Sequence, residues 1–211
     1  MKNRNYGKLV AGIVGVWFVF SLSASALHLF KTDPSQPPIP IGLAALIPVT
    51  AFLFWFASSE AFRSFALALN PRTLTMVQSW RVAGFVFLVL HTYGILPAVF
   101  ALPAGWGDIA IGATAPLAAI KLANPQWRKS LILWQVLGVT DLVMAVALGA
   151  TAGLLDPHGI PTAPMTVLPL SLIPTFAVPL LLIFHIICIA QARGWREQEH
   201  ARIAKVAVAV V

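Results

Sequence analysis

The chain has 211 residues, of which 59% are hydrophobic and only 10% are charged, and its mean hydropathy is +0.85. Soluble proteins are about half apolar and about a quarter charged, so this composition excludes a soluble globular domain and indicates an integral membrane protein. The formal net charge of +7 does not indicate a nucleic-acid partner, because the basic residues fall at the ends of apolar runs rather than on one polar face.

Apolar runs of about 20 residues are long enough to cross a bilayer. Six such runs follow one another in the chain, at about 9–30, 39–61, 76–101, 105–123, 130–153 and 165–192. The fourth carries Asp108 near its start, where the carboxylate is expected to cap the helix. The sequence therefore predicts an all-α, polytopic membrane helical bundle of six transmembrane helices, with residues 1–211 in a single transmembrane domain.

Basic residues gather in alternate connections between these runs. They are Lys2, Arg4, Lys8, Arg63, Arg72, Arg81, Lys121, Arg128, Lys129, Arg193, Arg196, Arg202 and Lys205, whereas the remaining connections hold one cation, Lys31. Because cytoplasmic loops are enriched in lysine and arginine, we expect both termini in the cytoplasm and a multi-pass protein of the plasma (inner) membrane.

The N-terminal run also has features of a secretory signal. Its basic start, apolar core and Ala24-Ser25-Ala26 resemble a cleavable segment, and removal of residues 1–26 would leave five spans in the same orientation. The apolar run is long for a signal, which favours six spans.

Two stretches of the sequence resemble each other at a distance of 54 residues. Asn70-Pro71 is matched by Asn124-Pro125, and Trp-Arg-Val-Ala-Gly, ending at Gly84, is matched by Trp-Gln-Val-Leu-Gly. The spacing predicts two related hairpins, residues 39–101 and 105–153, as in the parallel repeats of some transport proteins. Chance similarity between apolar segments is the alternative.

Prolines recur every five residues in the last run, ending with Pro174 and Pro179. An interior proline removes a backbone hydrogen bond, so we expect a sixth helix that starts near Pro174 and is kinked near Pro179. The carbonyl oxygen of Thr175 would then lack its helical partner. A bound group, a water molecule or a neighbouring helix is expected there.

Three ionisable residues, His91, Asp141 and His185, lie deep within the apolar runs, where a charged group is costly and a functional role is the first hypothesis. His91 lies eleven residues from Trp80, and His185 lies ten residues from Trp195. At 1.5 Å per residue both are about 15–17 Å from the inner boundary, near the middle of the membrane. Asp141 is expected about one turn nearer the cytoplasm.

Three interpretations of these residues remain open. In the first, His91 and His185 are the axial iron ligands of a haem b used for transmembrane electron transfer, and Gly84 gives the macrocycle room. In the second, His91 and Asp141 are a protonatable pair in a proton-coupled carrier of a small molecule or ion. In the third, they are polar groups that hold the helices together without a cofactor.

The carrier hypothesis includes two further residues, Arg81 and Thr175, in its proton and substrate site. Arg81 also lies near the inner boundary, where it could pair with Glu60. No phosphate-binding loop, serine-nucleophile elbow or His-Glu-x-x-His zinc helix occurs in the sequence. Nucleotide hydrolysis and serine-type hydrolysis therefore have no support.

Overall fold

The computed structural model describes residues 2–32 and 38–209, and within these ranges the side chains from residue 6 to residue 195. The described chain contains helices and turns and no strand. In chain order the elements are α1 (Lys2–Ala26), α2 (Ile39–Ser58), α3 (Glu60–Leu67), α4 (Pro71–Val77), η1 (Gln78–Gly84), α5 (Phe85–Thr92), α6 (Ala98–Leu117), η2 (Ala118–Leu122), η3 (Pro125–Trp127), α7 (Arg128–Leu155), η4 (Ala163–Thr166), η5 (Ile173–Ala177) and α8 (Val178–Ala209).

Six helical stretches of the described chain are long and apolar enough to cross a membrane. They are Tyr6–Ala26, Ile39–Ser58, Pro71–Thr92, Ala98–Leu122, Pro125–Leu155 and Ile173–Trp195. Many large apolar side chains on them are exposed, as expected for helices that contact lipid. The predicted all-α fold is confirmed for the described residues, and its six long apolar helices match the predicted number of membrane spans.

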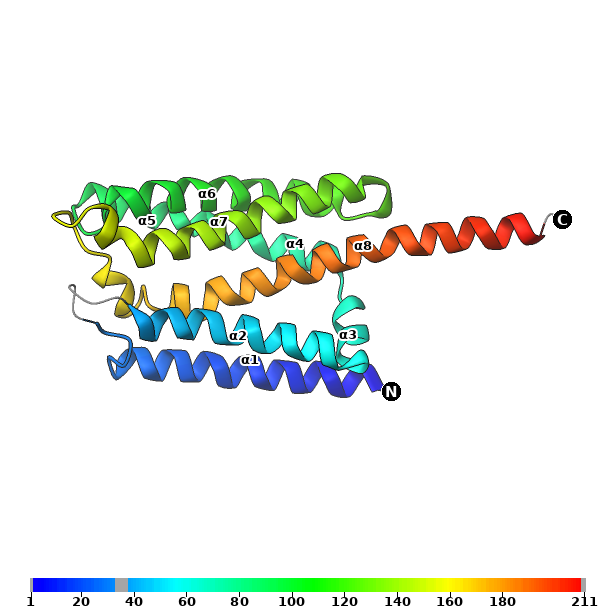
Figure 1. Cartoon of the computed structure of the whole chain (residues 1–211), viewed down its shortest axis with the longest axis horizontal. Helices are drawn as coiled ribbons and strands as arrows, with labels where there is room; N and C mark the ends of the chain where they lie inside the picture. Colours follow the sequence, from blue (N-terminus) through cyan, green and yellow to red (C-terminus); the bar gives the residue numbers. More distant parts are fainter. Residues whose placement is uncertain (1, 33–37, 210–211) are drawn as a thin grey trace.

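The spans run side by side along one long axis (Figure 1). α8 packs against α2 on one side and against α7 on the other. The two turns that contain Asn70-Pro71 and Asn124-Pro125 lie at the same end of the bundle as the N-terminus (Figure 1), and we call this the Asn-Pro end. The other end, with the connections after α1, α5 and α7, is called the opposite end.

Both Asn-Pro turns start a new span in the same way. The side-chain oxygen of Asn70 accepts a hydrogen bond from the backbone N–H of Arg72 at 2.9 Å. The side-chain oxygen of Asn124 accepts one from the backbone N–H of Trp127 at 3.3 Å. Each asparagine therefore satisfies a free N–H group of a helical first turn, which agrees with the predicted likeness of the two stretches.

The boundary between the third and fourth spans lies earlier than predicted. The third span ends at Thr92, and Gly94 turns the chain with a φ of +69° before Pro97 starts α6. Only glycine adopts such a φ without steric cost. The predicted limits, 76–101 and 105–123, were therefore wrong by several residues, and Asp108 lies in the middle of α6 rather than at its cap.

The last span begins with a π-helical turn, η5, that leads directly into α8. The carbonyl oxygen of Thr175 accepts hydrogen bonds from Trp17 Nε1 at 3.1 Å and from Ser21 Oγ at 3.4 Å. One turn away, Ser171 Oγ donates to Ser25 Oγ at 2.9 Å. The prediction that the Thr175 carbonyl oxygen meets a neighbouring helix is confirmed, and the bend at Pro179 stays a prediction.

Candidate functional site

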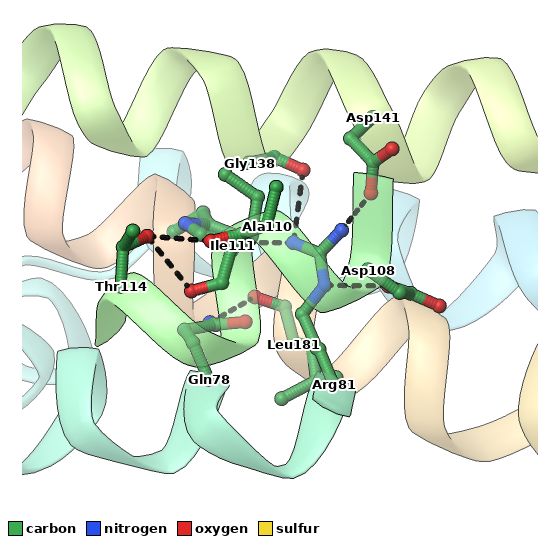
Figure 2. A network of polar contacts seen from close by, with 10 residues as sticks. Gln78, Arg81, Asp108, Ala110, Ile111, Thr114, Gly138, Asp141 and Leu181 are labelled. Carbon is green, nitrogen blue, oxygen red and sulfur yellow. Dashed lines mark hydrogen bonds and ion pairs between the residues drawn. The ribbon is translucent and has the colours of Figure 1, made fainter. Parts of the chain in front are cut away.

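The centre of the bundle holds a buried arginine. Arg81 lies in η1, and Nε donates to Asp108 Oδ1 at 2.7 Å, while Nη2 donates to Asp141 Oδ2 (Figure 2). Nη1 lies 3.3 Å from the carbonyl oxygen of Gly138 and 3.3 Å from His185 Nε2. All three guanidinium nitrogens are thus engaged, and one side chain connects the third span with the fourth, fifth and sixth.

These groups lie near the middle of their spans. Arg81 is ten residues after Pro71 and Asp108 is ten residues after Ala98, at the start of their spans. His185 is ten residues before Trp195, at the end of the last span. At 1.5 Å per residue, each is about 15 Å from a membrane boundary. The cluster of Arg81, Asp108, Asp141 and His185, called the ion cluster below, therefore lies near the middle of the membrane.

His185 is completely buried, and both of its ring nitrogens have partners. Arg81 faces Nε2, and Gln135 Oε1 faces Nδ1. A guanidinium group only donates hydrogen bonds, so Nε2 must accept and Nδ1 must carry the proton that Gln135 Oε1 accepts. The contacts therefore require a neutral imidazole with its proton on Nδ1.

Polar side chains continue from the ion cluster toward the Asn-Pro end. Gln135 Nε2 donates to Thr75 Oγ1 at 2.9 Å, and Thr75 Oγ1 lies 3.8 Å from Cys188 Sγ. Gln78 Nε2 donates to the carbonyl oxygen of Leu181 at 3.1 Å (Figure 2). These side chains are buried, so hydrogen-bonded side chains close the interior on this side of the cluster.

Glycines make room for the ion cluster. A methyl group in place of the glycine hydrogen would collide with a cluster side chain at three positions, namely Gly84 with Asp108, Gly107 with Asp141 and Gly138 with His185. Gly84, which was expected to give a macrocycle room, leaves room for Asp108 of α6. The spans can therefore bring their charged groups together only because these positions lack a Cβ.

The ion cluster contains more carboxylates than cations. Asp108 and Asp141 supply two acidic groups and Arg81 supplies one positive charge, while the contacts of His185 require a neutral ring. With both carboxylates ionised, the cluster would carry one uncompensated negative charge. Asp141 Oδ1 is buried and has no hydrogen-bond partner among the described residues. A proton or a cation at the cluster would remove this costly excess charge.

An apolar cavity of about 80 Å³ reaches the ion cluster from the opposite end. Its lining includes Pro38 and Thr162 near that end and the aromatic rings of Phe87 and Phe100. Asp108 is the only charged residue that lines it within the described chain, and its side chain is 15% exposed. The cluster is thus approached by a cavity on one side and enclosed by polar side chains on the other.

The structure separates the two histidines that the sequence placed at one depth. His91 lies in the last turn of α5, at the end of the third span, and its Nδ1 lies 3.2 Å from the carbonyl oxygen of Leu96. The expected depth of His91 was wrong because the third span begins at Pro71 and ends at Thr92. Asp141 and His185 do come together, and Arg81 rather than His91 connects them.

The surroundings of His185 do not suit the predicted ligation of haem by His91 and His185. An axial ligand must offer a free imidazole nitrogen to the iron, but Arg81 and Gln135 engage both ring nitrogens of His185. Gly84, which was expected to face a macrocycle, faces Asp108. The residues of the predicted haem site do not fit the group. No set of three or more metal-binding side chains occurs among the described residues either.

Sequence reasoning missed two residues of the site, Asp108 and Gln135. Asp108 was interpreted as a helix cap, whereas Arg81 was expected either in the site of a carrier or at the inner boundary beside Glu60. The two residues form an ion pair in the interior. Gln135 entered the sequence analysis only as part of the repeated motif, in which it matches Arg81. That match could have indicated a shared role, since both residues contact His185.

The chain belongs to a family described as a domain of unknown function, DUF8737, whose family model matches residues 38–193. The matched range contains the second to fifth spans, the sixth span as far as Arg193, and every residue of the ion cluster. No curated protein and no solved structure matches the chain.

Proposed function

We propose that this protein is a proton-coupled carrier of a small molecule or ion in the plasma membrane, with both termini in the cytoplasm. The ion cluster is its coupling site. The observation that carries the proposal is the pairing of two carboxylates, the buried Asp141 and the partly buried Asp108, with a single guanidinium group in the middle of the membrane. Such a site holds a proton or a cation at neutral total charge, and intramembrane acidic groups of this kind serve as proton relays in transporters.

Access to the cluster from only one side supports the proposal. A carrier exposes its site first to one face of the membrane and then to the other. The cavity meets Asp108 from the opposite end, and buried side chains such as Gln78 and Gln135 close the path toward the Asn-Pro end. This arrangement corresponds to the state of a carrier that receives its ligand from the outer face, given the proposed orientation.

Irregular helical segments beside the site offer places where the spans can bend. The 3-10 segment η1 carries Arg81 itself and lies inside the third span, whereas the π-helical segments η2 and η5 form the last turn of the fourth span and the first turn of the sixth. A 3-10 segment inside a longer helix often marks a hinge or a functional site. In the proposed cycle, ligand binding near Asp108 and proton release from the cluster change the contacts of Arg81, and the spans rearrange around these segments.

Two other roles were considered. Haem-based electron transfer is not supported, because the predicted ligands do not fit. A purely structural role for the polar residues accounts for the hydrogen bonds. It does not account for an excess carboxylate beside a cavity, since a structural network gains nothing from an uncompensated charge.

Transport by proteoliposomes with an imposed pH gradient tests the proposal. We would measure the accumulation of three membrane-impermeant radiolabelled probes, tetramethylammonium, methanesulfonate and erythritol, which are positive, negative and uncharged. We expect accumulation of one probe class that requires the pH gradient and is lost in Asp141→Asn but kept in Asp156→Asn, whose side chain is exposed in a connection at the opposite end. If no probe accumulates, or if accumulation is indifferent to both the gradient and Asp141→Asn, the carrier proposal fails.

A further inference from the structure

The cavity beside Asp108 has the chemistry of a site for a small organic cation. Its polar floor is a carboxylate, and its walls include the rings of Phe87 and Phe100, whose centroids are 5.4 Å apart. Aromatic rings attract cations through their negative faces, and sites for quaternary ammonium groups combine such rings with low polarity. A carboxylate and two phenyl rings around one apolar space are the groups that an alkylated ammonium ion requires.

The charge of the ion cluster also favours a cation over other ligands. Arg81 faces Asp108 directly, and the same guanidinium group connects Asp108 with the other titratable groups of the cluster, Asp141 and His185. Arg81 Nε engages Asp108 Oδ1, and no hydrogen bond joins Asp108 Oδ2 to any other described residue. An anion at this place would add a further negative charge beside two carboxylates, whereas a monovalent cation would compensate the excess negative charge. A cation and a proton therefore compete to neutralise the same excess charge of the cluster.

The size of the cavity limits the ligand. A cavity of about 150 Å³ holds a benzene molecule, and a water molecule in the liquid takes up about 30 Å³. The cavity of about 80 Å³ is smaller than the cavity that holds benzene and larger than the volume of one water molecule. The bound part of the ligand is therefore an ammonium group with a few methyl or methylene groups, and any longer apolar tail would extend toward the opposite end.

We propose that the cavity between α2, α5, α6 and α7 binds small alkylammonium cations, with Asp108 as the charge partner and Phe87 and Phe100 as aromatic walls. This inference rests on the proposed carrier function and names its substrate class. One cation enters as one proton leaves the ion cluster, so the net charge of the site is unchanged. The ligand exchanges with a proton and forms no covalent bond.

Binding of radiolabelled tetramethylammonium to the detergent-purified full chain, measured by equilibrium dialysis in a buffer without organic cations, tests the inference. We expect saturable binding of one cation per chain, and no binding of radiolabelled tert-butanol, which is similar in size and uncharged. Asp108→Asn should weaken the binding about tenfold or more, as expected for loss of a charged partner. Asp156→Asn should leave it unchanged.

Two further measurements keep the result interpretable if Asp108→Asn destabilises the protein. Phe87→Leu keeps an apolar wall and the charge of Asp108 but removes a ring, so we expect weaker binding of tetramethylammonium. In weakly buffered solution, binding to the wild-type chain should release protons, and Asp141→Asn should suppress this release.

The inference is overturned if the wild-type chain does not bind tetramethylammonium, if tert-butanol binds equally well, or if binding is indifferent to both Asp108→Asn and Phe87→Leu. These results leave the carrier proposal intact when methanesulfonate or erythritol accumulates in proteoliposomes in response to the pH gradient. If none of the three probes is transported, the carrier proposal fails. If tetramethylammonium nevertheless binds, the protein is a cation-binding protein and not a carrier.

Discussion

Arg81 and Gln135 contact the two ring nitrogens of His185 from opposite sides. They occupy the same position in the two copies of the repeated motif, one in the third span and one in the fifth. The motif glycines Gly84 and Gly138 also serve the same purpose, because each leaves room for a polar side chain of another span. The repeated motif therefore gives the third and fifth spans similar surfaces. His185 of the sixth span lies between Arg81 of one and Gln135 of the other. The extent of the predicted hairpins, 39–101 and 105–153, stays a prediction.

The first prediction concerns the neutral imidazole of His185. Gln135→Leu removes the acceptor of the Nδ1 proton and the donor to Thr75 Oγ1. Leaving buried polar groups unpaired costs about 1–3 kcal/mol, so we expect a lower free energy of unfolding in detergent. Gln126→Leu, at an exposed position of η3, is the matched control and should have little effect. Equal stability of the two variants would show that the contact with His185 is unimportant.

The second prediction concerns the charge balance around Arg81. Arg81→Gln leaves the buried Asp141 and the partly buried Asp108 without their cation, and breaking a buried ion pair such as that of Arg81 and Asp141 costs about 3–5 kcal/mol. Adding Asp141→Asn should restore part of the loss, because it removes one of the uncompensated charges. Thermal unfolding of the single and double variants measures this coupling, with the exposed Arg72→Gln as the control. Additive effects would contradict it.

The third prediction concerns the space that glycine provides. Gly138→Ala would push a methyl group into the His185 ring, whereas Gly153→Ala in the same helix meets nothing within 4 Å. Overpacking a dense interior costs about 1–3 kcal/mol, and alanine at an open helical position is favourable. We therefore expect opposite changes in unfolding temperature for the two variants. A neutral Gly138→Ala would mean that His185 can move away without cost.

The fourth prediction concerns haem. Because both ring nitrogens of His185 are engaged, protein produced with an adequate haem supply should show no Soret band in its visible spectrum. His185→Ala should lower stability, and His91→Ala should change it little, because His91 contacts only the local carbonyl oxygen of Leu96 among the described residues. A Soret band that disappears in both variants would restore the haem hypothesis.

The fifth prediction concerns orientation. The distribution of basic residues predicts the Asn-Pro end in the cytoplasm. A membrane-impermeant thiol reagent added to intact cells should therefore label Asp156→Cys, and it should label Gln126→Cys only after lysis. Cys188, the single native cysteine, is buried and should give little background. The reverse pattern of labelling would place both termini outside.

The site was partly predictable because depth within an uninterrupted helix follows from counting residues. His185 is followed by ten helical residues up to Trp195, and its predicted depth agrees with its place in the last span. The same count failed for His91, because the turn at Gly94 and Pro97 shortens the third span at the opposite end. The turn at Gly94 ends the third span soon after His91, so this expected iron ligand lies at the end of its span and not in the middle of the membrane.

Hydropathy over about 20 residues is a local property, so the sequence alone was enough to predict an all-α protein with six helices long and apolar enough to span a membrane. The prolines also predicted that the Thr175 carbonyl oxygen needs an outside partner. Only the tertiary structure decided which charges meet. Asp108, Asp141 and Arg81 lie on three different spans, and their meeting depends on how the helices rotate and pack against one another. That packing follows from the sum of many contacts across the bundle, and no short stretch of sequence encodes it.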